Sequence, residues 1–308
     1  MNKGRLAALL GAFAALSFLL TCGEAEDPTS GRLVVIGSES AGRAMDDEAR
    51  EFMAMYGKAV VRAVGVGSEA GLKALFDSPH SKDTVLAVSA RPLSQSELAA
   101  ARGQGLDPKE YRIALDGIAI IVNESNPVDS LTLDQVRDIL SGQIVNWRQV
   151  GGPDRPIRVK FGQPGSATYG QMRDSVLGGA GLATATQHYA SMYEIVRAVA
   201  GDKDAVGYCG LSFLYRDWMA KPPFPEPGIR AVGLARTPAG PFVTPDPGTV
   251  YDKSYPLWRY IYLYARHEPK GIMSGFVTFV MSSKGQQVLV QQGLAPTTVK
   301  FIVNREAE

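Results

Sequence analysis

The N-terminal third of the chain repeats one order three times: an apolar run, a loop of small polar residues and a segment with helical spacing. The apolar runs at 33–36, 59–66 and 84–88 are rich in β-branched residues, and glycine or serine follows each of them. Strands that alternate with helices predict an α/β fold with a largely parallel sheet, because the helices cover the faces of the sheet.

Serine follows the end of each of these predicted strands. Ser38 and Ser40 come after the first strand, Ser68 after the second and Ser89 after the third. The carboxyl ends of parallel strands meet at one edge of the sheet, where ligands bind in a crevice. We therefore expect these hydroxyls to share a binding site. The alternative is that each serine is a helix cap or a turn residue.

A later loop, G-Q-P-G-S-A-T-Y-G at 162–170, lies between an alternating apolar run at 157–161 and a segment with apolar residues at helical spacing. Ser166 and Thr168 therefore fall where a loop becomes a helix. The first N–H groups of a helix have no internal partner, and the helix dipole places partial positive charge there. This arrangement predicts an anion site. The alternative is that Ser166 or Thr168 only caps the helix.

The N-terminus has the pattern of an export signal. Lys3 and Arg5 precede an almost wholly apolar stretch at 6–20, which is too short to span a bilayer comfortably. L-L-T-C at 19–22 resembles the bacterial lipobox, so we expect residues 1–22 to be a lipoprotein signal ending at a lipid-modified Cys22, with 23–31 as a polar tether. The alternative is an ordinary signal peptide without lipid.

Composition indicates a globular protein and excludes some partners. The chain has 308 residues, 45% hydrophobic and 20% charged, with a net charge of +1. This balance argues against nucleic-acid binding, which needs a strong basic excess. Cys209 is the second of two cysteines. If Cys22 is modified, no intramolecular disulfide can form, and Cys209 is expected to be packed in the core rather than reactive.

The sequence gives little support to an enzyme. His80, His188 and His267 are isolated, and no HExxH, GxSxG or P-loop pattern occurs. Asp116 is an acidic residue on a predicted strand near the expected crevice, and a buried, hydrogen-bonded carboxylate is its structural explanation. We therefore expect no catalytic residues, no metal and no cofactor.

Several passages together resemble the phosphate-binding proteins of bacterial ABC importers, in the type II periplasmic-binding-protein family. The resemblance extends from about residue 33 to 296, and its most specific part is the long passage at 116–153. The other matching passages lie at 37–40, 67–73, 89–93, 165–168, 206–208, 255–257 and 282–286.

The resemblance implies a two-lobe α/β fold. Each lobe would contain a mixed, mostly parallel sheet flanked by helices, and two crossing hinge strands would join the lobes. Residues 32–120 and 258–308 would form lobe 1, and residues 121–257 would form lobe 2.

The resemblance also implies that phosphate binds between the lobes, held by hydroxyls and backbone N–H groups. The implied phosphate-binding residues are Ser38, Ser40, Ser68, Ser166, Ala167, Thr168 and Arg91. Three positions depart from the family: Gly162 replaces an arginine, Ala90 an acidic or hydroxyl residue, and Met192 an asparagine. Arg91 is expected either to replace the lost arginine as a ligand or to form a structural salt bridge.

The function implied is a lipid-anchored, monomeric solute-binding protein at the periplasm or cell surface. It would capture inorganic phosphate, or a related oxyanion, and deliver it to an ABC permease in the inner membrane. The three departures motivate an alternative, in which the same fold acts as an extracytoplasmic anion sensor or interaction module without transport.

Overall fold

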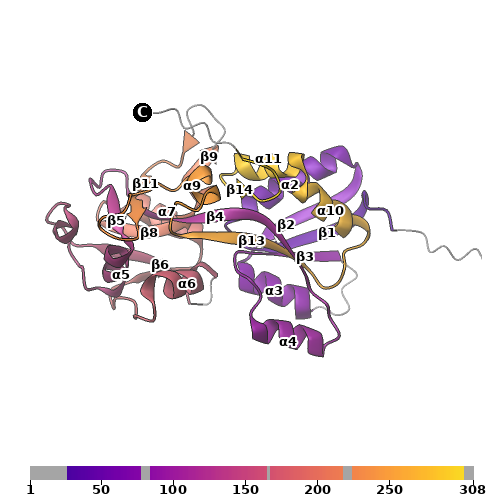
Figure 1. The fold of residues 1–308 in the computed structure, drawn as a ribbon, viewed down its shortest axis with the longest axis horizontal. Helices are drawn as coiled ribbons and strands as arrows, with labels where there is room; N and C mark the ends of the chain where they lie inside the picture. The colour runs from indigo at the N-terminus through magenta and orange to yellow at the C-terminus, as the bar shows by residue number, and fades with distance from the viewer. Residues whose placement is uncertain (1–25, 78–83, 165–166, 218–223, 302–308) are drawn as a thin grey trace, which may run out of the picture.

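Two strands, β4 (Lys109–Asn123) and β13 (Trp258–Ala265), run between the two halves of the molecule and pair with each other antiparallel (Figure 1). The computed structural model describes residues 26–77, 84–164, 167–217 and 224–301. One sheet passes through both halves in the order β2-β1-β3-β13-β4-β8-β6-β7. The prediction of a two-lobe α/β fold with two crossing strands is confirmed.

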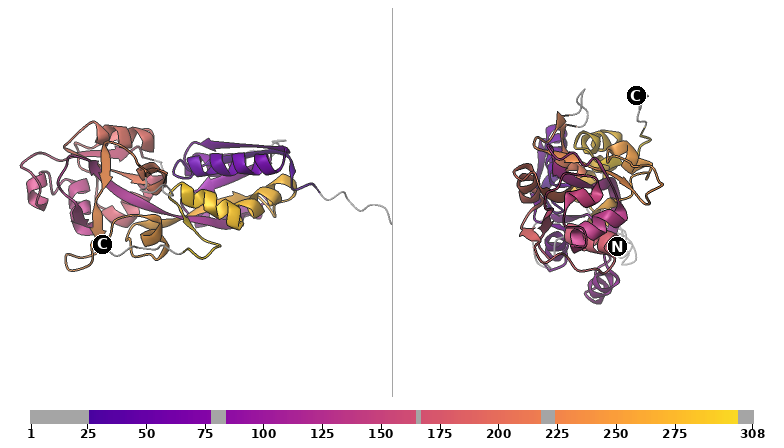
Figure 2. Two further views of the ribbon diagram at one scale, coloured as in Figure 1. Left: turned by 90° about the horizontal axis from the view of Figure 1, so that it is seen from above. Right: turned by 90° about the vertical axis from the view of Figure 1, so that its left-hand side faces the viewer.

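The first half contains the three predicted strand–helix repeats. Its strands β1 (Ser30–Gly37), β2 (Lys58–Gly65) and β3 (Thr84–Ser89) are parallel, and β3 pairs antiparallel with β13. Helices cover both faces of this sheet, and Figure 2 shows α2 packed beside the yellow C-terminal helices on one of them. The helices of this half are α2 (Gly42–Met55), α3 (Ser68–Asp77), α4 (Gln95–Gly103), α10 (Gly271–Met281) and α11 (Ser283–Gln291).

The second half is built on three further strands of the same sheet. β8 (Ala205–Gly210) is antiparallel to β4 and parallel to β6 (Arg158–Gly162), which is parallel to β7 (Gln187–Tyr189). The helical segments here are α5 (Leu133–Ser141), η1 (Trp147–Val150), α6 (Ala167–Met172), the π-helical turn η2 (Arg173–Leu177), α7 (Met192–Ala200), α8 (Leu211–Leu214) and α9 (Pro247–Tyr251). The short strands are β5 (Ser130–Thr132), β9 (Tyr215–Asp217), β10 (Phe224–Pro225), β11 (Ile229–Ala231), β12 (Gly233–Ala235) and β14 (Ala295–Pro296).

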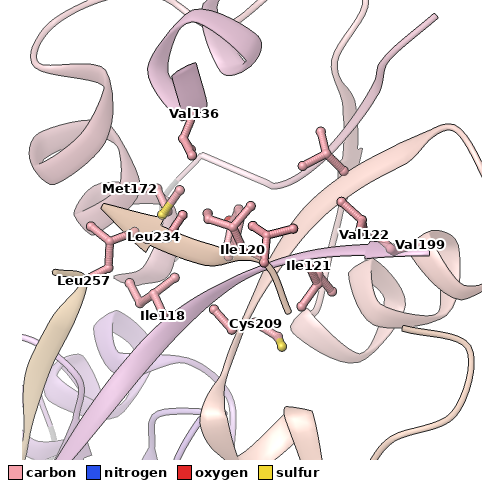
Figure 3. Close-up of a cluster of buried hydrophobic side chains, with 14 of the residues drawn as sticks. Ile118, Ile120, Ile121, Val122, Val136, Met172, Val199, Cys209, Leu234 and Leu257 are labelled. Carbon is pink, nitrogen blue, oxygen red and sulfur yellow. The ribbon is translucent and has the colours of Figure 1, made fainter. Parts of the chain in front are cut away.

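Each half has its own hydrophobic core, and β4 contributes to both. Ala114 belongs to the core of the first half, whereas Leu115 already belongs to that of the second. Figure 3 shows the second core, where Ile120 on β4 lies near Leu234 and Cys209 packs on the other side of the strand. Cys209 is completely buried, as predicted, and this burial raises the pKa of its thiol, so the thiol stays protonated and unreactive.

Capping residues in the sequence correctly mark the starts of several helices. Serine or threonine followed three residues later by glutamate or glutamine predicts a capping box, and Ser94 with Glu97 and Thr132 with Gln135 form such boxes at the starts of α4 and α5. Ser191 caps α7 as predicted, but its capping box is incomplete because the Glu194 carboxylate accepts from the backbone of Ala190 instead. None of the described helices is both long and apolar enough to cross a membrane.

One predicted helix is wrong. The residue pattern at 212–218 predicts a helix, yet α8 ends at Leu214 and the chain continues as strand β9. β9 pairs antiparallel with β10, the next strand along the chain, so hydrogen bonds between strands replace those of a longer helix.

Candidate functional site

A pocket of about 40 Å³ lies between the two halves, at the carboxyl ends of strands from both. One buried water needs roughly 10–15 Å³ on the same measure, so this pocket has room for a small ion and not for an organic molecule. Its lining residues are Ser38, Glu39, Ser40, Gly67, Ser68, Gly162, Tyr189, Ala190, Ser191, Met192, Ile195 and Tyr208.

Two glycines let β1 approach β3 on one side and α3 on the other closely enough to form one wall. Gly37 has a φ of +146°, and a Cβ built on it would lie 1.9 Å from the Val88 carbonyl oxygen. A Cβ on Gly71 would lie 2.5 Å from the Cα of Gly37. Because neither side chain can be accommodated, glycine at both positions places Ser38 beside the first turn of α3, which begins at Ser68.

The hydroxyls in this wall are buried and already accept hydrogen bonds. Ser38, Ser40 and Ser68 are at most 3% exposed. The Ser68 hydroxyl oxygen accepts from the backbone N–H of Ala90 at 2.9 Å, and the Ser40 hydroxyl oxygen accepts from Arg259 at 3.1 Å. The Ser38 and Ser40 hydroxyl oxygens lie 3.0 Å apart, so one of the two donates its proton to the other. Because each hydroxyl has one proton, the proton of Ser68 and one proton of the Ser38–Ser40 pair stay available. The wall therefore presents donors, as an oxyanion requires.

A buried ion pair supports Ser40 from behind. The Arg259 Nε and Nη2 atoms donate to the same Asp116 oxygen, at 3.0 and 2.8 Å, and both side chains are nearly inaccessible to water. The other Asp116 oxygen accepts from the backbone N–H of Leu211 at 3.1 Å. Asp116 is thus the buried, hydrogen-bonded carboxylate predicted from the sequence. Arg259 was not predicted, although a charged residue inside an apolar strand is a signal that could have identified it.

Glu39 joins the two halves across the pocket. It lies between the two serines of the loop after β1, and its Oε2 atom accepts from the backbone N–H of Met192 at 3.1 Å. Met192 is the first residue of α7, where free N–H groups and the helix dipole favour negative charge. The chain therefore places its own carboxylate on a donor that an anion in the pocket would otherwise use. No local pattern in the sequence predicts this contact.

The loop after β6 is held by a tyrosine of the neighbouring strand. The Tyr208 hydroxyl accepts from the backbone N–H of Gly162 at 3.0 Å, and burial raises the pKa of this tyrosine, which keeps its hydroxyl protonated. On the other side, the carbonyl oxygen of Gly162 lies 3.0 Å from Nδ1 of His188. These contacts fix the chain just before the predicted third anion loop.

The structure thus brings three of the predicted residues, Ser38, Ser40 and Ser68, into one pocket. Ser166 lies outside the described residues. Ala167 and Thr168 begin α6, but their side-chain positions are not described. The predicted lipidation site, Cys22, also lies outside the described residues.

Arg91 does not line this pocket. Its guanidinium donates to both oxygens of Glu97, each at 2.8 Å, and this contact lowers the pKa of Glu97 to about 2. The geometry is that of the salt bridge named as the second possibility for Arg91. Ser89 bonds the backbone of Arg91 through its hydroxyl, which is the turn role also considered above.

Comparison with known proteins places these features in a family. A sequence model of the PBP superfamily domain matches residues 23–284. The phosphate-binding protein PstS of Pseudomonas aeruginosa is 24% identical over 288 residues, which cover 88% of this chain and 84% of the relative. PstS of Bacillus subtilis is 24% identical over 315 residues, covering 97% and 96%.

A solved structure from Clostridium perfringens is similar throughout. It is a substrate-binding protein assigned to a phosphate ABC transporter and contains bound phosphate. It superposes with a TM-score of 0.74 at 28% identity, covering 87% of this chain and 100% of the other.

Proposed function

The chain belongs to the PBP superfamily, and from this premise we propose that it is an extracytoplasmic solute-binding protein that captures inorganic phosphate between its lobes. The observation that carries this proposal is the convergence of three buried serine hydroxyls on a pocket of ion size, where Ser68 and one of the bonded pair Ser38 and Ser40 keep a proton to donate. The relatives named as phosphate-binding proteins, and the bound phosphate in the C. perfringens structure, support the choice of ligand.

Neutral donors are sufficient for such a site. A hydrogen bond to a charged acceptor contributes about 1.5–3 kcal/mol. Several of these bonds, less the cost of ordering the loops, reach roughly 8 kcal/mol, which corresponds to micromolar affinity. We propose that Ser38, Ser40 and Ser68 supply part of this set, and that Ser166, Ala167 and Thr168 complete it from the second lobe. Arg91 is not needed for this arrangement.

Calorimetry on protein unfolded and refolded to remove bound ligand tests the proposal. We expect phosphate to bind, and Ser68→Ala to weaken binding by at least tenfold through the loss of one charge-assisted bond. Ser274→Ala, on α10 away from the pocket, is the matched control and should leave the affinity unchanged. Binding of another oxyanion in place of phosphate would reassign the ligand, and full affinity in Ser68→Ala would move the site elsewhere.

We extend the proposal to the cellular setting predicted from the sequence. The chain would be exported, anchored through a lipid on Cys22, and would deliver its ligand to an ABC permease in the inner membrane as a monomer. Residues 32–120 and 258–308 would act as one lobe and residues 121–257 as the other. Cys22→Ser should release the protein from the membrane fraction; continued membrane association would rule out this anchor.

A further inference from the structure

A second and much larger groove opens beside the serine pocket. It encloses about 740 Å³ and extends over both halves of the molecule. Aromatic side chains form part of its surface: Trp258, Tyr260 and Tyr262 come from β13, and Tyr169 comes from α6. The rings of Trp258 and Tyr260 meet edge to face, with centroids 5.5 Å apart, so the aromatic surface is continuous along the strand.

Two contacts connect this groove to the serine pocket. Ala90 lines the groove, and its backbone N–H bonds the hydroxyl of Ser68 in the pocket. Arg259 also lines the groove, and its guanidinium bonds the hydroxyl of Ser40. The pocket and the groove therefore adjoin, with Ala90 and Arg259 at the border between them.

The two spaces fit different parts of one ligand. The volume of the groove falls in the range of about 300–1,000 Å³ that is typical of small organic ligands, and the pocket is far below it. The cations that line the groove are paired with carboxylates: Arg91 with Glu97, Arg173 with Asp174 and Arg259 with Asp116. Glu69 adds a further carboxylate to its wall. Lys253 lies over the Trp258 ring and Arg112 over the Tyr260 ring, and neither cation lines the groove. The groove thus offers the opposite faces of these rings rather than a second anion site.

Ala90, which lies at the border between the pocket and the groove, has a side chain that suits the bridging oxygen of a phosphate monoester. Ala90 is buried, and its methyl group neither donates nor accepts a hydrogen bond. A phosphate monoester presents three free oxygens and one bridging oxygen that needs no donor. The free oxygens can accept hydrogen bonds from the serine hydroxyls of the pocket, and the bridging oxygen can face the methyl group of Ala90.

We propose that the groove binds the planar organic part of a phosphate monoester whose phosphate occupies the serine pocket. This inference rests on the proposed function, because it takes the same pocket as the phosphate site. The ring of such a ligand would stack on the aromatic side chains of β13 in the way that bases stack on aromatic side chains elsewhere.

Calorimetry with inorganic phosphate, phenyl phosphate and adenosine 5′-monophosphate tests this assignment on the refolded full chain. We expect the two aromatic monoesters to bind about tenfold more tightly than phosphate, since stacking on one aromatic side chain has an effect of this order. Tyr260→Ala should remove this advantage and leave the affinity for inorganic phosphate unchanged, whereas Tyr260→Phe should retain the advantage.

Phe242→Ala removes an exposed ring outside the groove and is the matched control. Unfolding temperatures of all variants separate lost binding from lost folding. Binding of inorganic phosphate together with failure of both monoesters would overturn the inference and leave the proposed function intact. Failure of all three ligands would overturn the proposed function, and this inference with it.

Discussion

The carboxylate of Glu39 is the least expected group in a pocket of hydrogen-bond donors. It accepts from Met192 N–H at the start of α7 and so neutralises part of the attraction that this helix offers to an anion. A phosphate ion entering the pocket meets this negative charge and must either displace it or tolerate it. The charge and the hydrogen bond of Glu39 therefore have opposite effects on binding, and they can be separated.

Glu39→Gln separates them, because the amide oxygen can still accept from Met192 while the charge is removed. We expect phosphate affinity to rise by about tenfold through the loss of like-charge repulsion. Calorimetry at pH 7.5 measures this change. Glu51→Gln, on the outer part of α2, is the control and should have no effect. Weaker binding in Glu39→Gln would instead mean that the carboxylate accepts a hydrogen bond from a protonated phosphate oxygen.

Glu48 is a second unusual carboxylate, and it affects stability rather than binding. It is completely buried on α2, and neither of its oxygens meets a hydrogen-bond partner within the part of the chain that the structure describes. Burial, with a smaller effect from Glu51, raises its pKa from 4.5 to about 9. The folded protein therefore keeps Glu48 protonated at neutral pH, whereas the unfolded chain releases this proton.

This difference makes stability depend on pH. The contribution of Glu48 to the free energy of unfolding is complete below about pH 4.5 and is lost progressively as the pH rises towards 9. Glu48→Met removes the titrating group, so we expect it to stabilise the protein by about 1–3 kcal/mol at pH 8 and much less at pH 5. Urea unfolding at both pH values measures this. Asp46→Asn, exposed on the same helix, should show no such pH dependence; equal effects at pH 5 and 8 in Glu48→Met would contradict the explanation.

At the level of elements, the first wall of the pocket depends on how closely α3 packs against β1. A Cβ on Gly71 would lie 2.5 Å from one backbone atom and 2.6 Å from another, the carbonyl oxygen of Ile36. We therefore expect Gly71→Ala to push α3 outward, destabilise the protein by about 1–3 kcal/mol and weaken phosphate binding, since Ser68 moves with the helix. Thermal unfolding and calorimetry measure the two effects.

Gly103→Ala is the matched control, because a Cβ on Gly103 at the end of α4 meets no atom within 4 Å. This substitution should be neutral or slightly stabilising, as glycine is a poor helix former. Normal stability and binding in Gly71→Ala would show that the contact between α3 and β1 yields easily, and that Ser68 does not depend on it.

The elements themselves were readable from the sequence where the signals are local. The strand–helix repeats and the capping boxes depend on residues a few positions apart, so periodicity and capping chemistry identify them. The apolar run at 118–122 covers only part of the 15-residue β4, because Asp116 and Gly117 interrupt the apolar residues before it and the first four positions alternate between partly exposed and exposed. β9 was missed because it depends on pairing with β10.

In the candidate site, too, only the residues with a local signal could be predicted from the sequence. Ser38, Ser40 and Ser68 follow strand ends, and this position alone indicates a shared crevice. Glu39 and Arg259 owe their roles to partners 153 and 143 residues away, Met192 and Asp116. No pattern within one segment encodes such pairs. The aromatic groove could not be predicted from the sequence either, because the residues of β13 are equally typical of a strand buried in the core.

For the whole molecule, the pair of Asp116 and Arg259 lies where the halves meet. Asp116 is on β4 and Arg259 on β13, the two strands that run between the lobes, and the pair is bonded to Ser40 and Leu211 as well. One buried pair thus connects the sheet, the pocket and the start of α8. Removing one partner leaves an uncompensated charge in the interior, which typically costs about 3–5 kcal/mol.

Asp116→Asn is therefore expected to lower the free energy of unfolding by several kcal/mol and to weaken phosphate binding, because Arg259 is released from the position in which it bonds Ser40. Chemical unfolding with and without phosphate measures both effects in one series. The control lies on the same strand: Arg112 and Glu110 form an exposed pair on β4, and Glu110→Gln should cost no more than about 1 kcal/mol. If the two substitutions cost the same, the ion pair at the junction would be no more important than a surface contact, and the pocket would have to be held by the backbone of its loops alone.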